Sequence, residues 1–139
     1  MSSDFPFSTA RSSLLNTETF RNLLGNALEN STKSVIILSA YVKTVGVNWL
    51  KEKISDKKIN CTIVTRWNNG DLAQGSSDLE CYHLAKKNNW SFKVLQDLHA
   101  KVMLVDNDIL FIGSPNLTGR GMSLVPVSNE ELGIKVKAL

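Results

Sequence analysis

The sequence has few of the residues that mark secreted, zinc-binding or membrane-spanning chains. Its 139 residues include two cysteines, Cys61 and Cys81, too few for a disulfide framework or a four-cysteine zinc site. No apolar run is long enough to cross a membrane, and the N-terminus lacks the basic-then-apolar pattern of a signal peptide. We therefore expect one cytoplasmic domain over residues 1–139, with both cysteines as reduced thiols in or near its core. No metal site and no cofactor are expected.

The sequence also lacks a large excess of positive or negative charge. Sixteen Lys and Arg residues face thirteen Asp and Glu residues, which gives a net charge of +3. Hydrophobic residues make up 42% and charged residues 21%, as in an ordinary globular chain. This mildly basic balance permits a polyanionic partner but does not require one.

Apolar patterns predict an α/β fold with a mixed β-sheet flanked by helices on both faces. The spacing predicts helices over residues 16–29, 47–54 and 76–89, the last with Ser77 as N-cap. Short apolar runs predict strands over residues 34–40, 61–65, 91–95, 99–105, 109–112 and 131–136. Residues 1–13 are expected to be irregular, with Phe5 and Phe7 docked on the domain, residues 68–71 to form a turn, and residues 117–128 to form a surface loop. Because no helix is predicted after the last strand, the chain is expected to be part of a longer one.

Polar and charged residues concentrate in one stretch, 98–121, which reads LHAKVMLVDNDILFIGSPNLTGRG. His99 and Lys101 are two residues apart, so on a strand both side chains project from the same face. Ser114 and Asn116 repeat that spacing after the second apolar run. An imidazole, an ammonium group and two neutral hydrogen-bonding groups brought together in this way predict a phosphate site. Read alone, His99 would more often be a structural histidine.

This stretch resembles the phospholipase D superfamily, whose motif is His-x-Lys, four residues, Asp, and then Gly-Ser-x-Asn. His99-Ala100-Lys101, Asp106 and Gly113-Ser114-Pro115-Asn116 match it in order. Arg66-Trp67, residues 75–80 and Asn129-Glu130-Glu131-Leu132-Gly133 extend the similarity to bacterial phospholipase D-like proteins. Several of these are nuclease domains, some in restriction enzymes that cut DNA without a metal.

The resemblance implies roles for individual residues. His99 would attack phosphorus to form a covalent phosphohistidine, and a second histidine would protonate the leaving oxygen. Lys101 would neutralise phosphate charge, and Asn116 would orient a phosphate oxygen. Ser114 is as well placed to hold the turn as to contact phosphate. Glu131, the carboxylate before Leu-Gly, would hold the second nitrogen of the His99 ring.

Strand geometry separates other candidates from these roles. Glu130 points to the opposite face from Glu131 and is expected to be solvated. Asp106 lies seven residues from His99, more than about 20 Å along an extended chain, so we expect it to cap the hairpin turn. Arg66 and Trp67 follow a strand and either touch nucleic acid or belong to the core. Arg120 either binds a neighbouring phosphate or is a solvated loop residue, and His83 is expected at the surface of a helix.

The resulting hypothesis is a metal-independent phosphodiesterase that cleaves DNA, as a restriction or defence nuclease module. Because the chain has one matching motif, the second histidine is expected from a second copy, in a homodimer that shares one active site. A phospholipid-hydrolysing enzyme is the alternative within the same chemistry. A non-catalytic phosphate-binding or dimerisation module is the alternative outside it.

Overall fold

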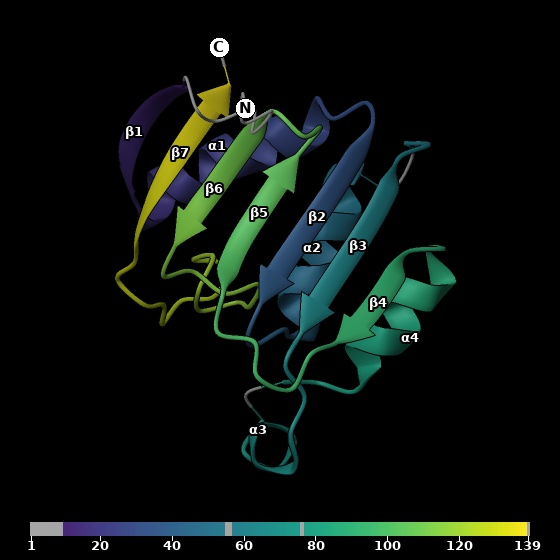
Figure 1. Cartoon of the computed structure of the whole chain (residues 1–139). Helices are drawn as coiled ribbons and strands as arrows, with labels where there is room; N and C mark the ends of the chain where they lie inside the picture. Colours follow the sequence, from purple (N-terminus) through teal and green to yellow (C-terminus); the bar gives the residue numbers. More distant parts are fainter. Residues whose placement is uncertain (1–9, 55–56, 76, 139) are drawn as a thin grey trace.

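A seven-stranded mixed sheet organises the molecule (Figure 1). The computed structural model describes residues 10–54, 57–75 and 77–138. The strands are β1 (Ala10–Asn16), β2 (Ser34–Ser39), β3 (Asn60–Thr65), β4 (Ser91–Val94), β5 (Lys101–Val105), β6 (Ile109–Gly113) and β7 (Leu132–Ala138). The helices are α1 (Thr17–Glu29), α2 (Thr44–Ile54), α3 (Asn69–Ala73) and α4 (Glu80–Lys87).

The strand order is β1-β7-β6-β5-β2-β3-β4. Strands β2, β3 and β4 run parallel, and the remaining neighbours pair antiparallel. The α/β class and the mixed sheet predicted from the sequence are confirmed, and so is the hairpin of β5 and β6. Because β5 and β7 run against β2, β3 and β6, the ends of β2, β3 and β6 meet the starts of β5 and β7 at one edge of the sheet (Figure 1).

The core lies between one face of the sheet and the helices. On β6, Phe111 is fully buried and packs edge-to-face on Phe20 of α1, with ring centroids 5.5 Å apart. Its neighbour Ile112, which points to the other face, is 43% exposed. Helices α1, α2 and α4 contact one another in sequence and cover the Phe111 face. Within the described residues no helix covers the second face, so the predicted helical cover on both faces is wrong for this part of the chain.

The second face remains apolar although it is uncovered by helices in the described ranges. Leu14, Ile36, Ile112 and Ile134 are all exposed on it, from four different strands. A continuous apolar run such as that of β2 is typical of a strand buried on both faces. The observed alternation of buried and more exposed positions shows one buried face and one partly open face.

Several predicted boundaries change because of long-range contacts. Residues 10–13, expected to be irregular, belong to β1, which pairs along its whole length with β7. Phe5 and Phe7 lie outside the described residues. The expected turn over 68–71 is the start of α3, where the side chain of Asn68 accepts a hydrogen bond from the Asp71 N–H at 2.7 Å. The expected surface loop over 117–128 is largely packed into the molecule, with Leu117 and Met122 fully buried.

The third predicted helix begins later than its pattern indicated. Ser77 is buried and is not its N-cap; α4 begins at Glu80 after Leu79. The next residue, Asp78, instead accepts hydrogen bonds from the N–H (2.9 Å) and Oγ1 (2.6 Å) of Thr44. This contact stabilises the first turn of α2, which therefore starts three residues earlier than predicted.

Both cysteines are buried and unpaired, as the sequence predicted for core thiols. Burial raises the pKa of the Cys61 and Cys81 thiols to about 12, so both are protonated and unreactive at neutral pH. None of the described helices combines the length and the apolar character needed to span a bilayer.

Candidate active site

The predicted site residues gather at the edge of the sheet where β2, β3 and β6 end and β5 and β7 begin (Figure 1). Lys101 is the first residue of β5, and His99 precedes it by two positions. Ser114 and Asn116 follow β6, and Glu131 immediately precedes β7. Antiparallel pairing thus brings together residues that are up to 32 positions apart in the sequence.

The strand registers align His99 with Glu131. Val102 pairs with Ile112, and Gly113 pairs with Gly133, so one row across the sheet contains Lys101, Gly113 and Gly133. The same registers continued by two residues put His99 and Glu131 on either side of position 115. Strands β5 and β7 are two strand spacings apart, about 10 Å, which a histidine and a glutamate side chain can bridge. No hydrogen bond or ion pair joins the two side chains in the described structure.

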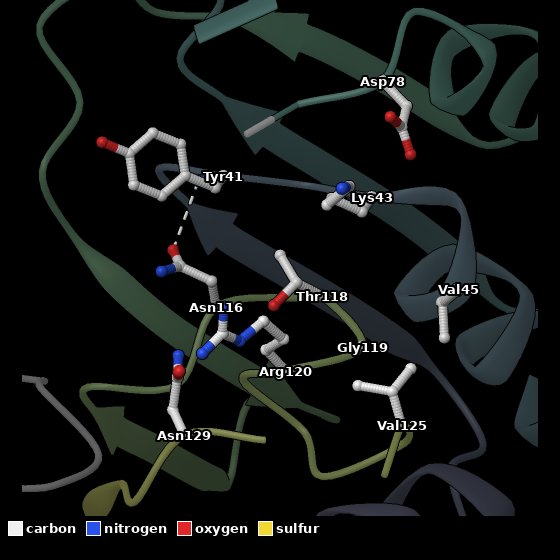
Figure 2. Close-up of a pocket in the computed structure, with 10 residues that line it drawn as sticks. All are labelled: Tyr41, Lys43, Val45, Asp78, Asn116, Thr118, Gly119, Arg120, Val125 and Asn129. Carbon is white, nitrogen blue, oxygen red and sulfur yellow. Dashed lines mark hydrogen bonds between the residues drawn. The ribbon is translucent and has the colours of Figure 1, made fainter. Parts of the chain in front are cut away.

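Asn116 is the best-fixed of the predicted residues. Its Oδ1 accepts a hydrogen bond from the Tyr41 N–H at 3.2 Å and lies 3.2 Å from the hydroxyl of Ser39 (Figure 2). Ser39 is fully buried and pairs with Lys101 across β2 and β5. Because the amide oxygen is held in this way, the NH₂ group of Asn116 is turned away from Tyr41 and available to donate to a ligand.

Two glycines explain why the strands approach so closely next to the site. A β-carbon at Gly113 would lie 2.5 Å from the Gly133 Cα, and one at Gly133 would lie 2.4 Å from the ring of Phe20. Ser114 then ties the end of β6 to β7. Its N–H donates to the Leu132 carbonyl (3.0 Å), and its Oγ accepts from the Leu132 N–H (3.0 Å). The Ser114 hydroxyl is thus engaged with the main chain beside Glu131.

The main chain of Glu131 is anchored by a residue that the sequence did not single out. The Glu131 N–H donates to the Oγ1 of Thr17 at 2.7 Å, at the first residue of α1. Its side chain is partly buried, whereas that of Glu130 is exposed. The different burial agrees with the predicted difference in direction between these two neighbours.

The motif aspartate lies at the far end of β5 from His99. The Asp106 carboxylate accepts hydrogen bonds from the N–H groups of Thr32 (2.9 Å), Lys33 (2.8 Å) and Ser34 (3.1 Å). Burial acts to raise the pKa of Asp106, but these hydrogen bonds outweigh it, so the pKa is below its ordinary value. The predicted structural role is confirmed, but its target is wrong: Asp106 caps the loop between α1 and β2 rather than its own hairpin.

Arg66 is a structural residue beside the site. Its Nε lies 3.0 Å from Asp71 Oδ2, and both side chains are largely buried. A second nitrogen donates to the Tyr41 hydroxyl at 2.8 Å, and the guanidinium lies over the Tyr41 ring. Trp67 stacks on Phe92 with centroids 5.0 Å apart. Of the two interpretations left open by the sequence, the packing favours the structural one for both residues.

A cavity of about 410 Å³ opens beside this edge (Figure 2). Among the predicted catalytic residues, Asn116 alone lines it within the described part of the chain. Its other walls come from the β2–α2 connection and the first turn of α2, from the segment before α4, and from the loop after β6: Tyr41, Lys43, Val45, Asp78, Thr118, Gly119, Arg120, Val125 and Asn129. Most of these were not found from the sequence, because they have no shared motif and meet only through folding.

Comparison with known proteins agrees with this geometry. The family described as cardiolipin synthase, PLD-like domain, matches residues 24–138. The chain belongs to the phospholipase D superfamily. Its matched region includes the whole His99–Glu131 constellation, so the resemblance seen in the motif extends to most of the domain. A search of curated proteins found no match to this sequence.

Several solved structures have the same fold. NucT from Helicobacter pylori superimposes with a TM-score of 0.70 at 18% identity, over 92% of this chain and 86% of NucT. Nuc from Salmonella typhimurium, a phospholipase D family member, gives 0.68 at 16% identity, over 93% and 85% of the two chains. The archaeal chromatin protein TrmBL2 gives 0.59 at 11% identity, over 94% of this chain and 47% of TrmBL2.

Two further features concern the chemistry of the candidate site: the possible metal ligands and the position of the second histidine. In the part of the chain that the structure describes, no group of three or more His, Cys, Asp or Glu side chains is placed to hold a metal ion. His83, the other histidine of the chain, is exposed on α4, which packs on β4 three strands away from β5. Three strand spacings, about 14 Å, thus separate β5 from the strand on which the helix of His83 packs.

Proposed function

We propose that this chain is a phosphodiesterase that cleaves DNA through a covalent phosphohistidine at His99. The observation that supports it is the convergence at one edge of the sheet of His99 from the β4–β5 connection, Lys101 from the start of β5, and Asn116 and Glu131 from the two ends of the β6–β7 connection. A cation and an amide donor beside an imidazole are the groups that a negatively charged phosphodiester requires for nucleophilic attack. The mildly basic chain favours a polyanionic substrate.

In the proposed reaction an unprotonated nitrogen of His99 attacks phosphorus, and the bond from phosphorus to the leaving oxygen breaks. The leaving oxygen takes a proton from a second imidazole. Water then attacks the phosphohistidine, gives a proton back to that imidazole, and releases His99. Lys101 and the Asn116 NH₂ group neutralise and orient the non-bridging oxygens, while Glu131 accepts the hydrogen bond of the other His99 nitrogen and fixes its tautomer. Ser114 positions the turn that carries Asn116.

The second imidazole is supplied, in this proposal, by His99 of a second copy. The chain contains two histidines, and the proposal does not assign the proton donor to His83, because His83 lies on α4 beside β4, three strands from β5, and matches no part of the motif. A symmetric homodimer with the site edges face to face would give one composite site with two copies of each residue. We further propose that such a dimer acts as the nuclease module of a restriction or defence protein, as the motif resemblance suggests.

A chelator assay tests the chemistry directly. Because Lys101 takes the charge-neutralising role in this proposal, cleavage of a generic DNA substrate is expected to persist in excess chelator, and His99→Ala is expected to have no detectable turnover. The covalent intermediate is expected as acid-labile label on the protein after rapid quenching with labelled DNA. Activity that is lost with chelator and restored by magnesium would overturn the mechanism.

Phospholipid hydrolysis is the second candidate, and the matched family is the observation that favours it, since its description names cardiolipin synthase. The same site chemistry applies to a lipid phosphodiester. Parallel assays on DNA and on phosphatidylglycerol vesicles separate the two. Turnover of the vesicles without turnover of DNA would replace the nuclease proposal with this one.

A further inference from the structure

The cavity beside Asn116 has the size and the mixed lining of a small-molecule site. Its volume of about 410 Å³ falls within the range of ligand pockets. Figure 2 shows Lys43 and Asp78 at one end and Arg120 with two amides, those of Asn116 and Asn129, at the other. Thr118 lies between the two ends, and Val45 and Val125 lie to one side. Arg120 lines the cavity from the loop after β6, and it is not one of the motif residues.

The cavity is continuous with the proposed reaction site through a short chain of contacts. Asn116 lines it, the Ser39 hydroxyl lies 3.2 Å from Asn116 Oδ1, and Ser39 pairs with Lys101 on the adjacent strand. A phosphodiester held by Lys101 and Asn116 would therefore have its next substituent at the mouth of the cavity. A group bound in the cavity would therefore lie next to the attacked phosphate.

The end of the cavity near Arg120 is positively charged. Two ion pairs occur among the described residues, Lys53–Glu29 and Arg66–Asp71, so no described carboxylate neutralises Arg120. Figure 2 shows its guanidinium extending toward the amides of Asn116 and Asn129. A guanidinium flanked by amide donors is suited to a phosphate group, because it offers several N–H groups in one plane.

The opposite end of the cavity is closer to neutral. Lys43 lies near Asp78, whose carboxylate is held by the N–H and hydroxyl of Thr44. Burial acts to raise the pKa of Asp78, but the Thr44 hydrogen bonds and the charge of Lys43 lower it below the ordinary value, so it is ionised at neutral pH. The Asp78 charge offsets that of Lys43, which leaves Arg120 as the main anion-attracting group.

The loop that carries Arg120 is held in place before any ligand arrives. The Arg120 carbonyl accepts a hydrogen bond from the Asn129 N–H at 3.0 Å, and the Gly119 carbonyl accepts one from the Leu124 N–H at 2.8 Å. The Lys43 N–H donates to the Leu117 carbonyl at 3.0 Å, which ties the loop to the end of β2. Such preorganisation lowers the entropy cost of binding.

We infer that this cavity binds the nucleotide next to the attacked phosphodiester, with Arg120 on the flanking phosphate. The inference rests on the proposed function and names its substrate class: a polynucleotide, in which a second phosphate follows one sugar away. The small apolar wall of Val45, Thr118 and Val125 fits a sugar and part of a base. A phospholipid would need an extended apolar groove for its acyl chains, which these lining residues do not form.

The test compares two substrates that differ in the flanking phosphate. Bis(p-nitrophenyl) phosphate has one phosphodiester and none beside it, whereas a single-stranded oligonucleotide has a series. For Arg120→Gln, kcat/KM on the oligonucleotide is expected to fall about tenfold more than on the small diester, mainly through KM. The slope of log binding affinity against log salt concentration is expected to decrease by about the amount of one phosphate contact. Arg120→Lys is expected to recover part of the loss.

The matched control is Arg11→Gln, which removes an exposed arginine of β1 at a distance from the cavity and is expected to match wild type on both substrates. Equal losses on both substrates for Arg120→Gln would place Arg120 at the attacked phosphate and overturn the inference, as would no loss on either. If wild type turned over neither substrate, the proposed function would fail. Binding of a fluorescent oligonucleotide would then decide the inference: weaker binding by Arg120→Gln supports it, and unchanged binding overturns it.

Discussion

The carboxylate of Asp106 accepts a 2.8 Å hydrogen bond from the main-chain N–H of Lys33, at the end of β5 opposite to His99. One strand thus presents the first two letters of the motif to the site and uses its third letter to hold a distant loop. The motif residues thus lie at two places that are separated in space by the length of β5.

Replacement of Asp106 is expected to reduce stability but not the chemistry. Asp106→Asn tolerates the positive φ of 53° at this position, so it tests the charge rather than the backbone. Loss of charge-assisted hydrogen bonds to three N–H groups is expected to lower the free energy of unfolding by about 1–2 kcal/mol at pH 7. The expected loss is small for three such bonds because the carboxylate is partly exposed. Urea denaturation measures it.

The contribution of the Asp106 hydrogen bonds to stability is expected to decrease as the pH falls. The folded-state pKa of Asp106 is lowered, so its contribution is complete above the unfolded-state pKa of about 3.9 and is lost as the pH falls through the lower folded-state value. Asp106→Asn is expected to flatten this part of the stability curve. Asp108→Asn, an exposed control in the same turn, is expected to leave it unchanged; equal effects would contradict the assignment.

The two neighbouring glutamates are expected to differ in activity. The strand registers, continued by two residues, align Glu131 with His99, and Thr17 fixes its main chain, so Glu131→Ala is expected to lower kcat at least tenfold. Glu130→Ala is expected to be near wild type because its side chain is exposed on the other side. Similar losses in both variants, with folding verified by circular dichroism, would refute the assignment of Glu131.

The glycines beside the site are expected to respond differently to one compensating change. Gly133→Ala would place a β-carbon 2.4 Å from the Phe20 ring and is expected to cost about 1–3 kcal/mol of stability. Phe20→Leu is expected to recover part of this loss, since it removes the ring that the new methyl meets. Gly113→Ala meets main-chain atoms of Gly133 and Leu132 instead, so Phe20→Leu is not expected to help it. Thermal denaturation of the three single and two double variants measures both couplings, and recovery in both would contradict this packing.

A shared site predicts dominance of an inactive copy. When wild type and His99→Ala are mixed equally and exchange subunits, about a quarter of the dimers are fully wild type, compared with half before exchange. Activity is expected to fall to about half, because a heterodimer lacks one of its two imidazoles. Labelled subunits verify the exchange by energy transfer, and undiminished activity after verified exchange would show that each chain works alone.

The sequence by itself determined the features that depend on local pattern. The apolar runs of β2, β3, β5 and β6 and the helical spacing of α1 gave these elements within one or two residues at most boundaries, because burial of one face selects a period of two or 3.6. The order of His99, Lys101 and Asn116 indicated the superfamily, because it resembles the motif of that superfamily.

Only the tertiary structure decided the features that depend on distant partners. Residues 10–13 become a strand because β7 pairs with them, the partners of Asp106 lie more than 70 positions before it, and the second sheet face stays uncovered by helices in the described residues. The cavity that joins Tyr41, Arg120 and Asn129 has no local signature either. Local periodicity indicates which face of a helix or strand is buried. These contacts depend instead on which distant segment packs against that helix or strand.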